Sequence, residues 1–393
     1  MGLSPYNGEG SEDVEANSMR QTGVTVCALM VAGAAAIALD ARAQTPATMR
    51  AENVVLVTLD GARWQDIFGG IDLDVLRSTS GDTAVEKTDT YQRYWAPTAA
   101  ERRAKVMPFL WQRLVAQEGF IAGNRALASR VEVANSHRFS YPGYSEMLTG
   151  APHDDVITSN DNRRYPFLTV LEWLRKDLQL PASGVAVFGS WETFNVIAER
   201  EEGAITINAG YEDVAGADPE MRTLSALQHL TPNGFHGARH DIYTYRFARA
   251  HLQVAKPRVL YLAFDETDDW AHLKRYDLVL DALHRSDAQL EQLWNWLQTD
   301  PQYRGKTTLV LTVDHGRGRT PADWTDHGKD VVGAHETWLG CFGPTVNARG
   351  ERSGGDPLYQ KQVAGTIATL LGRNFAAAVP GAAAPIRECL GAP

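Results

Sequence analysis

Four short runs of apolar, mostly β-branched residues stand out along the chain. They are continuously apolar rather than alternating, which is typical of strands buried on both faces of a sheet. The four predicted strands are Val54–Leu59, Val185–Phe188, Val259–Phe264 and Thr308–Val313. Elsewhere apolar residues return every three or four positions, which indicates amphipathic helices. The predicted helices are Phe109–Gln117, Leu168–Leu178, Asp277–Leu297 and Tyr359–Leu371.

Strands and helices that alternate in this way predict an α/β fold with a mainly parallel central sheet and helices on both faces. Two polar, turn-rich stretches, residues 69–105 and 203–240, interrupt the pattern and are expected to form insertions near the active face. We expect one catalytic domain over residues 46–375. The last residues, 376–393, are rich in Ala, Pro and Gly, and we expect a loose carboxy-terminal segment there.

The amino-terminal residues 1–43 differ in pattern from the rest. Arg20 precedes an apolar run, Val24–Leu39, and Ala41-Arg42-Ala43 follows it, which is the order of a signal peptide with an upstream extension. The run is short for a bilayer span, so we expect cleavage before Gln44, with an uncleaved anchor as the alternative. The mature chain is then periplasmic or secreted and has no membrane span.

Composition narrows the class of ligand. The 393 residues carry a net charge of −10, and no basic patch provides a surface for nucleic acid, so a small molecule is the expected partner. Cys27 lies in the predicted signal segment, which leaves Cys341 and Cys389 in the mature chain. In an oxidising compartment these two either pair or remain separate thiols.

Acidic residues follow three of the predicted strands, at the sheet edge where ligands bind in open α/β folds. A single aspartate there is common in turns, but histidines accompany this set. Carboxylate and imidazole ligands together suit zinc or another borderline divalent ion, and six of them are enough for two metal sites with open positions. The candidate ligands are Asp60, Asp268, His272, Asp314, His315 and His335.

Ser140 is the candidate nucleophile. It lies just before Pro142-Gly143 and a short helical stretch, Ser145–Thr149, where its hydroxyl would meet a metal ion and the positive end of a helix. Metal coordination activates a hydroxyl at neutral pH without a neighbouring histidine base. No Gly-x-Ser-x-Gly elbow surrounds this serine.

These motifs, in this order, resemble those of the alkaline phosphatase superfamily, and most closely its nucleotide pyrophosphatase/phosphodiesterase branch. The segments that carry the resemblance are Leu59–Trp64, Ser140–Pro142 with Leu148–Gly150 behind it, Glu266–Asp268 through His272, Asp314–Gly316, and His335. In order and spacing, the resemblance covers essentially the whole mature chain.

The resemblance implies a role for each residue of the site. Asp60, Asp314, His315 and Ser140 would hold one zinc, and Asp268, His272 and His335 would hold the other. Ser140 would form a phosphoserine intermediate during hydrolysis of a small phosphate ester. Asn160, with Asn162 as the fallback, would contact a phosphate oxygen beside the backbone amide that follows the nucleophile.

The chain departs from the branch at three places. Ser140 stands where many relatives carry threonine, Gly143-Tyr144 replaces their usual Asn-His, and Ala271 replaces a glycine. The first two departures put the choice between phosphodiesterase and phosphomonoesterase in doubt. Tyr141 and Tyr144 are the candidates for stacking on a leaving group, and we expect His327 on a surface loop near the site.

Three other functions compete with this interpretation. A sulfatase would need Arg where Tyr144 stands, and such enzymes bind a hard calcium ion through oxygen ligands rather than histidines. A phosphomutase would use similar groups on a cytoplasmic substrate, which conflicts with export. A non-catalytic metal-binding scaffold would lack part of the nucleophile and ligand set, which is complete here.

Overall fold

The computed structural model describes residues 50–391 except residues 215–217. The predicted signal segment lies outside the described residues. Within the described ranges, no helix is both long and apolar enough to cross a membrane.

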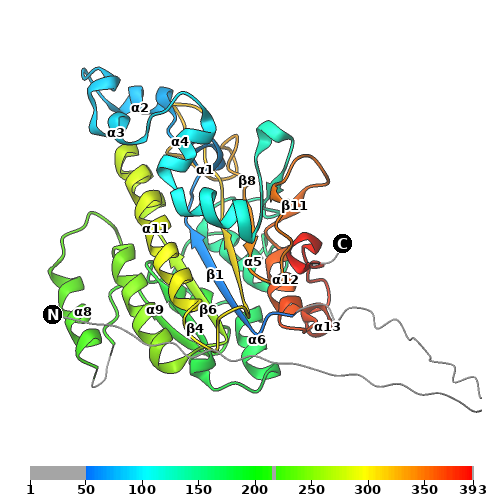
Figure 1. The fold of residues 1–393 in the computed structure, drawn as a ribbon. Helices are drawn as coiled ribbons and strands as arrows, with labels where there is room; N and C mark the ends of the chain where they lie inside the picture. Colours follow the sequence, from blue (N-terminus) through cyan, green and yellow to red (C-terminus); the bar gives the residue numbers. More distant parts are fainter. Residues whose placement is uncertain (1–49, 215–217, 392–393) are drawn as a thin grey trace, which may run out of the picture. The chain divides into compact units, whose positions relative to one another are not determined.

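An eight-stranded sheet forms the centre of the fold, in the order β10-β2-β9-β7-β1-β6-β4-β5 (Figure 1). The strands from β7 to β5 are parallel to one another, whereas β9 runs antiparallel to β7 and β2. The predicted α/β fold with a mainly parallel sheet is therefore confirmed. The strands are β1 Asn53–Leu59, β2 Gly119–Ala122, β4 Val185–Gly189, β5 Thr206–Ala209, β6 Val259–Phe264, β7 Thr307–Thr312, β9 Leu339–Phe342 and β10 Gly350–Glu351. A small second sheet joins β11 Leu358–Tyr359, β3 Val131–Glu132 and β8 Glu336–Thr337.

Strand β1 shows why the sequence folds into a covered sheet. All seven of its residues are buried, and alternate side chains enter two different hydrophobic cores. Val55 and Val57 point into one core, and Val54 and Leu56 into the other, because successive side chains of a strand point to opposite faces. Full burial of each such side chain contributes about 1.5–3 kcal/mol.

Helices cover both faces of the sheet, as predicted (Figure 1). Helices α9 and α11 pack in the core that contains Val55, and α5, α6 and α12 pack in the core that contains Val54. The helices are α1 Trp64–Gly69, α2 Leu73–Thr79, α3 Asp89–Tyr94, α4 Ala99–Val106, α5 Ser140–Thr149, α6 Val170–Asp177, α7 Phe194–Ile197, α8 Pro219–Leu230, α9 Asp241–Ala255, α10 Glu266–His272, α11 Tyr276–Leu297, α12 Gln362–Leu370 and α13 Phe375–Ala378. Leu110–Glu118 forms a π-helix, and short 3₁₀ segments lie at Val85–Lys87, Arg125–Leu127, Ala182–Gly184 and Arg387–Leu390.

The two turn-rich stretches contain more regular structure than their patterns indicate. Residues 69–105 include α2, α3 and most of α4, and residues 203–240 include β5 and α8. Helices of six to eight residues span too few turns to show a clear apolar period, so side-chain caps mark them better. Thr98 and Glu101, for example, form a capping box at α4.

The carboxy-terminal segment packs on the domain rather than lying loose. Cys389 forms a disulfide with Cys341 of β9, so the pairing that the sequence left open is made. Ile386 is 1% exposed, and the Ala383 N–H donates to the carbonyl of Gly150 at 2.9 Å. An Ala- and Pro-rich composition favoured a loose segment, but a covalent link and one buried isoleucine hold it.

Replacing both cysteines by serine should lower the free energy of unfolding by about 2–4 kcal/mol, because the disulfide closes a 48-residue loop and reduces the entropy of the unfolded chain. Urea denaturation with and without reductant measures the difference. Reductant should destabilise the native protein to the same extent and leave the double variant unchanged. Equal stability of the two proteins under oxidising conditions would contradict the prediction.

Candidate active site

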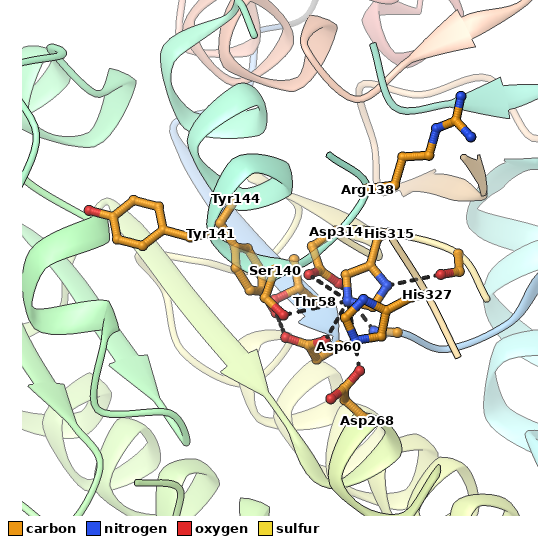
Figure 2. Close-up of polar contacts among 12 residues, drawn as sticks. Thr58, Asp60, Arg138, Ser140, Tyr141, Tyr144, Asp268, Asp314, His315 and His327 are labelled. Atoms are coloured by element: carbon orange, nitrogen blue, oxygen red, sulfur yellow. Dashed lines mark hydrogen bonds and ion pairs between the residues drawn. The ribbon is translucent and has the colours of Figure 1, made fainter. Parts of the chain in front are cut away.

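The carboxyl ends of β1, β6 and β7 meet at one edge of the sheet because these strands are parallel. Asp60 follows β1, Asp314 follows β7, and α10 with Asp268 follows β6. The first turn of α5 brings Ser140 to the same edge (Figure 2). Residues separated by up to 254 positions in the chain thus become neighbours.

Asp60, Asp314, His315 and Ser140 converge on one point (Figure 2). His315 Nε2 lies 3.4 Å from Asp60 Oδ1, 3.5 Å from Asp314 Oδ2 and 3.5 Å from Ser140 Oγ. In a tetrahedral zinc site with bonds of about 2.0–2.1 Å, ligand atoms lie about 3.3 Å apart. The spacing of these four atoms therefore fits the ligand shell of one divalent ion.

Each carboxylate and imidazole of this first group uses one of its polar atoms in a hydrogen bond to a neighbouring residue. The other polar atom points to the shared centre. Tyr144 donates its hydroxyl to Asp60 Oδ2 at 2.7 Å, and the Gly61 N–H donates to Asp314 Oδ1 at 3.1 Å. Asp60 Oδ1 and Asp314 Oδ2 are buried without a hydrogen-bond partner. His315 Nδ1 lies 2.9 Å from the Gly316 carbonyl, which makes Nδ1 the donor and leaves the Nε2 lone pair free.

The electrostatics of this group call for a cation. Asp60 and Asp314 are 1% and 0% exposed. Burial, followed by the charge of Asp314, raises the pKa of Asp60 to about 7. Burial likewise raises the pKa of Asp314 to about 7 and lowers the pKa of His315. Two buried carboxylates beside a neutral imidazole are costly to ionise, and a bound divalent ion would offset that cost.

The nucleophile candidate sits in the first turn of α5, where backbone N–H groups carry partial positive charge. Helix α5 also approaches the strand end closely, because a β-carbon on Gly143 would lie 2.4 Å from the Asp314 carbonyl oxygen. This packing therefore requires glycine at position 143.

A second group of possible ligands lies beside the first and comes from α10 and a loop. His272 Nε2 is 3.0 Å from Asp268 Oδ2 and 3.1 Å from His327 Nε2. Asp268 Oδ1 lies 3.7 Å from His315 Nε2 and pairs with Arg317. Burial, and then the nearby His315, lower the pKa of His327, which keeps its imidazole neutral as metal binding requires.

His327 is the residue that sequence reasoning placed outside the site. Its ring stacks on His315 with centroids 4.2 Å apart, and it groups with Asp268 and His315 as a possible metal site. The signal that could have found it is the triplet Asp326-His327-Gly328, which repeats Asp314-His315-Gly316.

His335, the ligand that the resemblance implies, belongs to neither group of possible metal ligands among the described residues. It is half-buried just before β8, and after burial the nearby Arg125 is the main cause that lowers its pKa. Its Nδ1 has no hydrogen-bond partner among the described residues. In position and contacts, His327 therefore fits the second group better than His335 does.

The remaining sequence candidates lie around the nucleophile. Asn160 is exposed and accepts a hydrogen bond through Oδ1 from the Tyr141 N–H at 2.9 Å, so it stands next to Ser140. Asn162 is also exposed. Tyr141 and Tyr144 are 2% and 0% exposed, so the prediction that they stack on a leaving group is wrong: both rings pack in the core.

Asp241 positions α10, and no sequence pattern pointed to it. Its carboxylate accepts the N–H groups of Asp265 at 2.8 Å and Glu266 at 3.2 Å, which caps the helix from another element. Thr267 adds a 2.5 Å hydrogen bond to the Asp60 carbonyl and ties α10 to the end of β1.

Residues of the first insertion and of α1 line most of a cavity of about 440 Å³. It is lined mainly by apolar side chains, among them Trp64, Phe68 and Trp95, with Arg102 at its side. Trp64, which lines the cavity, is the first residue of α1 and lies four residues after Asp60 in the sequence.

Neither a protein-family model nor a curated protein sequence matches the chain. Solved structures do match. The wild-type alkaline phosphatase PafA aligns with a TM-score of 0.56 and 11% identity, covering 87% of this chain and 99% of PafA. The fold is that of alkaline phosphatase. A putative sulfatase from Bacteroides thetaiotaomicron aligns with a TM-score of 0.50 and 13% identity, covering 85% of this chain and 73% of the sulfatase. Activity depends on the side chains of the site rather than on this shared fold.

Replacing Tyr144 by phenylalanine should weaken metal binding at the first group by about 10–100-fold, because the hydroxyl that orients Asp60 is lost. Titration of the metal-free protein with zinc, followed calorimetrically, measures the affinity. Tyr261→Phe is the matched control, since that buried hydroxyl contacts Thr58 rather than a carboxylate. Equal loss of affinity in both variants would rule out a specific role for Tyr144.

Replacing His327 by alanine should remove one of two bound metal ions, whereas His335→Ala should retain both, because only His327 lies beside His272 and His315. Metal analysis of the purified variants by mass spectrometry gives the number of ions per chain. The opposite result would return His335 to the ligand set.

Proposed function

We propose that this chain is a metal-dependent hydrolase of phosphate esters that acts through a phosphoserine on Ser140. The observation that supports the proposal is that Ser140 Oγ and one oxygen each of Asp60 and Asp314 lie 3.4–3.5 Å from His315 Nε2. A second group of carboxylate and imidazole side chains lies beside them. Asp60, Asp314, His315 and Ser140 would hold one ion, and Asp268, His272 and His327 the other. Zinc suits these oxygen and nitrogen ligands.

Two such ions, when bound, lower the pKa of a hydroxyl or water and stabilise charge on the attacking and leaving oxygens. Ser140 would lose its hydroxyl proton to solvent and attack phosphorus through Oγ. The bond from phosphorus to the ester oxygen breaks, the leaving alcohol takes up a proton from water, and phosphoserine forms. Water would then attack phosphorus and break the Ser140 ester, and the serine regains its proton. The resemblance assigns a non-bridging oxygen to Asn160 and to the backbone N–H that follows the nucleophile. In this structure the Tyr141 N–H donates to Asn160 Oδ1 at 2.9 Å, so a bound phosphate oxygen would take the place of that hydrogen bond.

Several observations favour phosphate over sulfate. Three histidines lie in or beside the two groups, whereas a sulfatase calcium site relies on oxygen ligands. Tyr144, which stands where the sulfatase signature needs arginine, is buried and bonded to Asp60. The resemblance to the nucleotide pyrophosphatase/phosphodiesterase branch makes a diesterase the first candidate, and a monoesterase the second.

We also propose that the chain acts outside the cytoplasm. Disulfides such as Cys341–Cys389 form and persist mainly in oxidising compartments. The signal-peptide pattern at the amino terminus agrees with export.

The purified protein should hydrolyse an aryl phosphate monoester or diester in a zinc-dependent reaction. Chelator should abolish the activity, added zinc should restore it, and Ser140→Ala should lower kcat by several orders of magnitude. A phosphorylated Ser140 peptide, identified by mass spectrometry after acid quenching, would identify the intermediate. Ser145→Ala, on the same helix, is the matched control and should keep its activity.

Three outcomes would argue against the proposal. Preference for an aryl sulfate would indicate a sulfatase. Turnover that survives the removal of all metal would exclude the two-ion mechanism. A protein that holds two zinc ions and turns over none of the three esters would indicate a binding scaffold.

A further inference from the structure

Arg138, two residues before the nucleophile candidate, has an unusual backbone conformation. Its φ is 58°, in the left-handed region, where the β-carbon of any residue other than glycine crowds the backbone. Such positions persist where surrounding contacts hold them, and they are found at functional sites. The contacts of Arg138 therefore indicate what the conformation achieves.

One side of Arg138 is anchored to the nucleophile helix. Its N–H donates to Asn135 Oδ1 at 2.7 Å. Asn135 in turn donates its backbone N–H at 2.7 Å and its side-chain amide at 2.9 Å to Glu146, a fully buried carboxylate of α5. Glu146 also accepts the N–H groups of Ala134 and Lys361, so two segments outside α5 hold its carboxylate.

The other side of Arg138 holds the loop that carries His327. Its carbonyl accepts the Gly328 N–H at 2.9 Å, and its Nη1 donates to the Lys329 carbonyl at 3.1 Å. Figure 2 shows the guanidinium directed away from the cluster of carboxylates and histidines. Arg138 therefore reaches the backbone next to His327 and not the reacting atoms.

His327 depends on such outside support. Residues 313–335 contain neither a helix nor a strand, so no regular hydrogen-bond ladder sets the position of this loop. Yet His327 Nε2 lies 3.1 Å from His272 Nε2, and its ring stacks on His315. A binding site requires its side chains to be placed within about 0.5 Å, which a loop achieves only when its backbone is held.

We propose that Arg138 is a positioning residue that fixes His327 at the second metal group, through a chain of contacts from Glu146 and Asn135 on one side to Gly328 and Lys329 on the other. This inference rests on the proposed function, because it assigns His327 to a metal ion. Arg138 thereby ties the loop that bears the last ligand to the helix that bears the nucleophile.

The test measures zinc affinity and thermal stability separately for Arg138→Ala, Asn135→Ala and the double variant. Each single variant should bind the second zinc ion at least tenfold more weakly and leave the first unchanged. The double variant should lose little more than either single one, because both residues lie in one chain of contacts. Arg138→Gly, in which a φ of 58° is unstrained, should melt higher than Arg138→Ala and still bind the second ion weakly.

Two controls separate positioning from general stability. Lys329→Ala removes a nearby exposed cation while keeping the carbonyl that Arg138 contacts, and it should bind zinc normally. Ala128→Gly relieves a left-handed residue in another segment and should change the melting temperature alone. If the Arg138 variants lose thermal stability but keep both zinc affinities, Arg138 has only a structural role. If His327→Ala also keeps two ions, the second group itself is wrongly assigned, which is a failure of the proposed function instead.

Discussion

The site depends on the burial of two carboxylates, Asp60 and Asp314, against one imidazole at the carboxyl edge of the sheet. Neither carboxylate is more than 1% exposed, and burial raises both pKa values to about 7. Negative charge in such a place needs compensation. The positive end of α5, the buried guanidinium of Arg317 and a bound divalent ion would each provide part of it.

Close backbone approach makes this burial possible. Gly143 lets α5 reach the Asp314 carbonyl, and Gly61, with φ at 56°, leaves room for Arg317 and Asp268 on the far side. Tyr144 and the Gly61 N–H then occupy the outer oxygens of the two carboxylates. The free oxygens are thereby directed inward, and Ser140 is brought to the same point by the helix that carries Tyr144.

The second group is built in a different way. Asp268 and His272 lie on α10, which Asp241 caps from α9, and His327 lies on a loop held by Arg138. The His272 side chain is 48% exposed, whereas that of His315 is fully buried. The first group is therefore enclosed at the strand ends, whereas the second is partly open to solvent at His272 and depends on the capping of α10 and on the contacts of one loop.

The sequence alone determined much of this protein. Continuous apolar runs located the four central strands to within one residue, because a strand that is buried on both faces is apolar at nearly every position. The same runs, by ending in Asp60, Asp314 and the acidic stretch before His272, located the edge where the chemistry lies. Short antiparallel strands such as β2 and β9, and the small helices of the insertions, carry too few residues to show a period.

Only the tertiary structure decided which distant groups meet. His327 and His335 lie in one stretch without a helix or strand, and their spacing in the sequence does not tell which of them is a metal ligand. The path of such a loop is set by contacts such as those of Arg138 rather than by local propensity. The partners of the ligands, Tyr144 and Asp241, and the pairing of Cys341 with Cys389 were hidden for the same reason. Local pattern fixes an element and its buried face, whereas the meeting of side chains depends on how the whole chain packs.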